Sequence, residues 1–154
     1  MSISVRFEPK EGYLRAEVTG VFTLAEACRT FREALTVVHD RGATRILVDC
    51  LGLTGKPTTL DYYQYGEFIA AELMQYAAAG KGRLKLAYVA RDPLVDPGHL
   101  SETVARNRAA QVAFVDTPAE ALRWLGVAST RKAADRVRAP LAGAPPDSAG
   151  PARP

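Results

Sequence analysis

Hydrophobic and polar side chains alternate in the first two segments of the chain. The segment from Ile3 to Phe7 has an apolar residue at every second position, and the segment 13–20 repeats this pattern. Such alternation is typical of strands with one buried face. A short loop containing Gly12 joins the two segments, so together they predict a β-hairpin.

Helical spacing and short apolar runs alternate in the following part of the chain. Apolar residues at intervals of three and four predict helices at about 24–41, 58–79, 98–108 and 118–126. Nearly continuous apolar runs predict strands at 45–50, 84–90 and 111–116, with a loop at 51–57. Thr23 and Thr117 each stand three residues before a glutamate and fit capping boxes. Gly66, in the middle of the second helix, indicates a close approach of another backbone.

The predicted elements follow the order β-β-α-β-α-β-α-β-α. Crossover connections through helices make the later strands parallel and cover the sheet. The sequence therefore predicts an α/β fold with a five-stranded mixed sheet and four helices, formed as one domain by residues 1–127.

The composition changes after residue 127. Residues 128–154 contain five prolines and scarcely any large apolar side chain, so we expect a disordered tail rich in Pro, Ala and Arg. This tail carries five basic and two acidic residues, which account for the whole net charge of +3. Because residues 1–127 are then neutral, the pI of about 9.0 gives no argument for nucleic-acid binding by the domain.

The closing segments carry a family resemblance. The element order, the VDC triplet that ends the third strand, the helix that starts at Thr58 or Thr59 and the segment ETVARNRAAQVAFVDTPAEALRWL are similar to SpoIIAA-like proteins. These are relatives of the STAS domain of anti-sigma factor antagonists and sulfate transporters. The resemblance covers residues 1 to about 127 and implies a non-enzymatic protein-interaction or regulatory module.

The resemblance also implies a site at the start of the second helix. In regulatory STAS proteins a serine there, usually preceded by an aspartate, is phosphorylated by a partner kinase, and the surrounding surface docks that partner. Thr58 or Thr59 occupies this position, with Lys56 and Pro57 before it in place of the aspartate. A phosphate at a helix N-terminus meets free N–H groups and a favourable dipole. The simpler alternative is that Thr58 only caps the helix.

Aromatic residues crowd the second helix on more than one of its faces. Tyr62, Tyr63 and Tyr65 cannot all enter a single core, so part of this surface is a candidate interface with a protein partner or a second copy of the chain. Leu94 and Val95 in the loop after the fourth strand are candidates for the same interface.

Other functional classes find little support. Cys28, Cys50, His39 and His99 lack metal-ligand spacing, so we expect no metal or cofactor. The segment LGLTGKPT resembles a phosphate-binding loop but has Cys50 where the first glycine is required and Pro57 after the lysine.

Catalytic and membrane functions are equally weakly supported. His99 and Ser101 are too close in sequence to act as base and nucleophile, and Asp49 has no identifiable partner, which leaves an enzyme of unknown reaction as a third alternative. A small-molecule or lipid carrier of CRAL-TRIO-like type is the second, although a domain of this size has little room for a large cavity. No apolar run is long enough to span a membrane, and the N-terminus lacks a secretory signal, so we expect a cytoplasmic protein.

Truncation after Val127 is expected to leave the melting temperature nearly unchanged, because residues 128–154 offer no apolar stripe to the domain. Thermal unfolding of the full chain and of residues 1–127 measures the difference. A drop of many degrees on truncation would show that the tail is docked.

Overall fold

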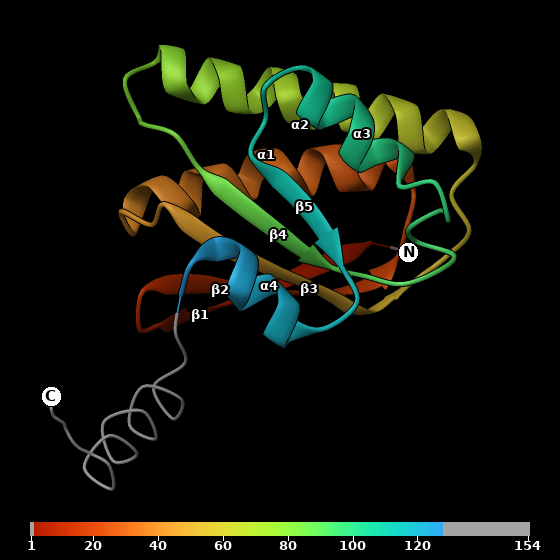
Figure 1. The fold of residues 1–154 in the computed structure, drawn as a ribbon, viewed down its shortest axis with the longest axis horizontal. Coiled ribbons are helices and arrows are strands. Elements are labelled where there is room, and N and C mark those ends of the chain that lie inside the picture. Colours follow the sequence, from red (N-terminus) through yellow and green to blue (C-terminus); the bar gives the residue numbers. More distant parts are fainter. Residues whose placement is uncertain (1, 128–154) are drawn as a thin grey trace, which may run out of the picture.

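Five strands and four helices follow one another in the predicted order in the computed structural model, which describes residues 2–127 (Figure 1). The strands are β1 (Ile3–Lys10), β2 (Tyr13–Val21), β3 (Arg45–Thr54), β4 (Lys85–Val89) and β5 (Val112–Val115). The helices are α1 (Leu24–Asp40), α2 (Thr59–Ala78), α3 (Leu100–Asn107) and α4 (Pro118–Leu125). The predicted tail lies outside the described residues, so the domain boundary stays a prediction.

The strands form one mixed sheet in the order β1-β2-β3-β4-β5. β1 is antiparallel to β2, and every later pair of neighbours is parallel. The predicted hairpin and the predicted fold class, a five-stranded mixed sheet with four helices, are confirmed. β1 and β5 are the two edges of the sheet.

The helices are divided unequally between the faces of the sheet. α1, α2 and α3 cover one face, and α4 lies against β3, β4 and β5 on the other (Figure 1). The larger core therefore lies between the sheet and the three-helix layer. A smaller one, which includes Leu47, Ala87 and Leu125, lies under α4.

Charged residues occupy the part of the sheet that α4 leaves uncovered. Arg15 of β2 donates to the carboxylate of Asp49 in β3 at 2.6 Å, and Arg6 of β1 pairs with Glu17 of β2. Asp49 is 8% exposed, so its pairing satisfies a carboxylate that is largely removed from water. The sequence did not identify this partner of Asp49, because strand register brings together residues that are 34 positions apart.

Both predicted threonine caps form, but neither predicted capping box is completed in residues 2–127. The carboxylates of Glu26 and Glu120 accept from the N–H groups of Ile3 and Asp116 instead of those of the threonines. The hydroxyl of Thr23 accepts from the N–H of Glu26, and that of Thr117 accepts from the N–H of Glu120, each at 3.2 Å. Both contacts satisfy N–H groups that a helix start leaves without an intrahelical acceptor. Pro118 follows the second cap at a position where its missing N–H does no harm.

Three boundaries differ from the prediction by two residues or more. β1 continues three residues past Phe7, to Lys10, because residues 8–10 still pair with β2. β3 continues through residues 51–54, which were expected to be a loop, because Gly52, Leu53 and Thr54 still pair with the last residues of β2. α3 begins at Leu100, two residues later than expected. The carboxylate of Asp96 accepts from the N–H of Leu100 at 2.8 Å and therefore stabilises this start from outside the helix.

Gly66 is the point at which α2 and α3 come closest. A Cβ atom at this position would lie 2.6 Å from the carbonyl oxygen of Ser101 and 3.0 Å from the Cβ of Val104. The predicted close backbone approach is thus confirmed. The Ser101 hydroxyl adds a hydrogen bond of 2.6 Å to the carbonyl of Tyr62, so the two helices are joined by both packing and a polar contact.

The variant Gly66→Ala is expected to lower the free energy of unfolding by about 1–3 kcal/mol, because α3 must move away. This loss would occur although alanine favours helix by about 1 kcal/mol. The control Ala71→Gly, at an exposed position of the same helix, measures the propensity difference alone. Urea unfolding of both variants tests the prediction, and a more stable Gly66→Ala protein would contradict it.

Candidate functional site

The start of α2 is a fully formed capping box. The Thr58 hydroxyl accepts from the N–H of Asp61 at 3.1 Å, and the Asp61 carboxylate accepts from the N–H of Thr58 at 3.0 Å. Thr58 is exposed but its hydroxyl oxygen is occupied by this contact. Thr59 is the first helical residue, is also exposed and has no part in the cap. The structure thus separates the two candidate threonines into a capping residue and a free one.

Two large apolar side chains stand exposed beside these threonines. Leu60 is 61% exposed and Tyr63 is 40% exposed. They are three residues apart, which places them on the same helix face. The buried residues of the same helix, which include Ile69 and Tyr76, lie on its inner side. We call Thr59, Leu60 and Tyr63 the α2 surface.

A hydrogen bond joins the loop after β4 to α2, next to this surface. The Tyr62 hydroxyl donates to the carbonyl of Pro93. Leu94 is partly buried, whereas Val95 is only 8% exposed and belongs to the core. Val95 was expected at an interface, and this expectation is wrong because its side chain turns inward.

Tyr65 is partly buried, and its ring packs against the core. Its hydroxyl is 3.0 Å from that of Tyr88 in β4, and its ring packs edge-on against Phe31 of α1. Burial raises the pKa of both tyrosines, so both phenols keep their protons at neutral pH. The hydroxyl of Tyr65 is thus directed into the domain, between α2 and the sheet, and a part of this residue in an interface stays a prediction.

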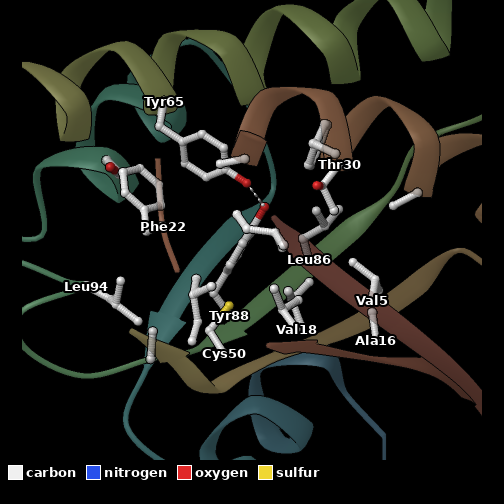
Figure 2. Close-up of a pocket in the computed structure, with 18 of the residues that line it drawn as sticks. Val5, Ala16, Val18, Phe22, Thr30, Cys50, Tyr65, Leu86, Tyr88 and Leu94 are labelled. Atoms are coloured by element: carbon white, nitrogen blue, oxygen red, sulfur yellow. Dashed lines mark hydrogen bonds between the residues drawn. The ribbon is translucent and has the colours of Figure 1, made fainter. Parts of the chain in front are cut away.

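A cavity of about 110 Å³ lies beside this tyrosine pair, between the helical layer and the sheet (Figure 2). Its lining includes Leu53 at the end of β3, Pro57 before α2 and Leu94 after β4. The cavity therefore extends to the carboxyl ends of the parallel strands, where α/β proteins commonly bind ligands. This volume is below the roughly 300–1,000 Å³ of pockets for drug-sized ligands, so it gives no support to a lipid carrier.

The reactive side chains of the chain have structural contacts. Ser101 donates to a backbone carbonyl, and His99 lies 3.3 Å from Glu102 rather than beside the serine. Burial and the nearby charge of Asp49 raise the pKa of Cys50 to about 12, so its thiol stays protonated. Among residues 2–127 no group of histidine, cysteine and acidic side chains is arranged to hold a metal ion. No helix in this part of the chain has the length and hydropathy for a membrane crossing.

Two residues of this region were not identified from the sequence. Leu60 was missed. Its position three residues before Tyr63 places both side chains on one helix face, and this spacing could have indicated an apolar surface. Thr30 was missed as well. Its hydroxyl is buried beside the cavity without a hydrogen-bond partner in residues 2–127. The signal was a polar residue between Ala27 and Ala34 on the inner side of a helix.

No protein-family model matches the chain, and no curated protein matches it. Several solved structures are similar to it, among them the following two. The first is an anti-sigma factor antagonist from Mycobacterium paratuberculosis, 16% identical with a TM-score of 0.49, and the match covers 81% of this chain and 95% of that one. The second is an uncharacterized protein with a SpoIIAA-like fold from Shewanella loihica PV-4, 18% identical with a TM-score of 0.46, covering 80% of this chain and 94% of that one. At these identities and TM-scores, neither match gives this chain a function.

Replacing Thr58 by alanine is expected to lower the free energy of unfolding by about 0.5–2 kcal/mol, because the Asp61 N–H loses its acceptor. Thr59→Ala, one residue further on, should change it by less than about 0.5 kcal/mol. Thermal and urea unfolding of the two single variants gives the comparison. Equal effects would show that the cap does not distinguish the two threonines.

Proposed function

We propose that this protein is a non-enzymatic, STAS-like regulatory module of the cytoplasm that binds a protein partner through the α2 surface. The observation that carries this proposal is the exposure of Leu60 and Tyr63 side by side on one helix face, next to the free hydroxyl of Thr59. Removing exposed tyrosine and leucine side chains from water lowers the free energy, so a partner that covers both is bound more tightly.

The rigidity of α2 supports this role. Ile69, Ala70 and Tyr76 on its inner side are buried, and Gly66 holds it against α3. The exposed face is therefore presented in one orientation, which reduces the ordering that a partner must impose on binding.

Thr59 is the residue that we assign to regulation. The Thr58 hydroxyl already accepts a hydrogen bond, and a phosphate there would lie next to the Asp61 carboxylate of the capping box. Thr59 has neither constraint. A phosphate on Thr59 would also stand near the N–H groups of the first turn of α2, whose dipole favours a negative charge.

The contacts of the polar groups support a binding rather than a catalytic role. Asp49 is paired with Arg15, Ser101 is bonded to the backbone of Tyr62, and the thiol of Cys50 is protonated at neutral pH. Asp49 and Ser101 are therefore engaged in contacts within the fold, and Cys50 lacks the thiolate that a nucleophile requires.

The double variant Leu60→Ser with Tyr63→Ser is expected to lose the partner while the melting temperature stays near that of the wild type, since both side chains are exposed. The control is Met74→Ser, because Met74 is 63% exposed on the same helix and lies about 17–21 Å further along it. Quantitative affinity purification from the native cell, with the tagged full chain and each variant, identifies proteins retained by the wild type and by Met74→Ser alone.

Two further variants test the regulatory residue. Thr59→Glu adds a charge and should reduce recovery of the same partner by tenfold or more. Thr59→Gln introduces a side chain of the same shape as glutamate but without the charge, and should keep most of the recovery. Identical recovery by all variants would refute the α2 surface as a docking site. Loss of a dimer in sedimentation velocity, with no other protein recovered, would instead identify a second copy of the chain as the partner.

A further inference from the structure

Small side chains from both layers are part of the cavity lining. Ala16 of β2 and Ala27 and Ala34 of α1 each contribute only a methyl group to it. Val48 also lines the cavity. It lies in the central strand on the face covered by three helices, and yet it is only partly buried. The space above it is therefore not filled by side chains of residues 2–127.

One polar atom in this apolar lining lacks a partner. The Thr30 hydroxyl oxygen is buried and makes no hydrogen bond with any group of the described chain. Figure 2 shows Thr30 on the side of α1 that faces the sheet, beside the cavity. A buried hydroxyl without a partner is unfavourable, and few are found in folded proteins.

The tyrosine pair adds a second polar group to the same lining. Tyr65 and Tyr88 bring two hydroxyl protons, and the single hydrogen bond between them uses one. The other proton has no acceptor within residues 2–127. Figure 2 shows this pair between α2 and the sheet, beside the same space as Thr30. The cavity is thus lined by apolar side chains with two hydroxyl donors available.

Charge restricts what the cavity can hold. No lysine, arginine or histidine is among its lining residues in the described chain. Asp61 is the acidic residue of the lining, and its carboxylate is engaged in the capping box at the start of α2. A carboxylate or phosphate inside would lose its hydration without gaining a countercharge, which is strongly unfavourable.

We propose that this cavity is a binding site for a small, uncharged, mostly apolar molecule with one oxygen that accepts a hydrogen bond from Thr30. The volume of about 110 Å³ fixes the size. A dry apolar cavity of about 150 Å³ accommodates benzene, so the ligand has about six heavy atoms. Small ketones are the chemical class that fits. This site is separate from the α2 surface and goes beyond the proposed function.

The alternative is a packing defect that binds nothing. Enlarging an alanine of the lining first tests whether the space can accept additional side-chain atoms. Ala16→Val adds two methyl groups toward the cavity, so it should leave the melting temperature unchanged or raise it. Ala87→Val is the control, because Ala87 is fully buried in β4 on the other face, under α4. Its substitution overpacks a filled core and should lower the melting temperature.

Ligand binding is tested with the full chain and a matched pair of probes, cyclopentanone and methylenecyclopentane. They have the same shape and six heavy atoms, but only the ketone accepts a hydrogen bond. In methyl NMR titrations we expect both to shift the resonances of Val48 and Leu86, which line the cavity, and not that of Leu125 on the other face. Ala16→Val should abolish the shifts for both probes.

Thr30→Val then isolates the hydrogen bond. It replaces the hydroxyl by a methyl group, so the ketone should bind about twofold to tenfold more weakly relative to the hydrocarbon than it does in the wild type. Thr30→Ser keeps the hydroxyl and should keep the ratio. Absence of shifts at Val48 and Leu86 up to the solubility of both probes would refute the site. An unchanged ratio in Thr30→Val would refute the role of Thr30.

Discussion

The contact between Tyr65 of α2 and Tyr88 of β4 joins the helical layer to the sheet. The two hydroxyls are 3.0 Å apart, and the rings meet edge-on at 6.3 Å. Tyr65 also packs against Phe31 of α1, and Tyr88 stacks on Phe114 of β5 at 4.6 Å. These large side chains therefore set the spacing between the layers. The cavity lies in the same space between the layers, and its lining includes Ala16, Ala27 and Ala34, whose side chains are single methyl groups.

The same contact also determines what α2 exposes. A helix fixed through Tyr65 toward the sheet and through Gly66 toward α3 has no freedom to rotate about its axis. Leu60 and Tyr63 are consequently held on the outside, although water is a poor environment for both. The fixed position of α2 therefore determines both the packing inside the domain and the apolar face that the helix exposes.

Much of the fold could be predicted because its determinants are local. Thr23 and Thr117 specify their helix starts through residues three positions away, and alternation specifies the first two strands. The end of β3 was missed because Gly52 carries no strand signal of its own and is paired only through β2. Other features depend on residues that are distant in sequence: the orientation of Val95, the Arg15–Asp49 pair and the cavity. A single sequence does not show which of these residues lie opposite one another, or how well their side chains fill the space between them.

The two edges of the sheet bear on how this protein meets its neighbours. β1 has a free side but contains Pro9, which cannot donate a backbone hydrogen bond, and it alternates Arg6, Glu8 and Lys10 with apolar residues. β5, the opposite edge, is only four residues long. Charge, proline and shortness are the means by which sheets avoid pairing with a strand from another molecule. Edge-to-edge pairing of this sheet with another molecule, the first step of fibre-like stacking, is thereby disfavoured.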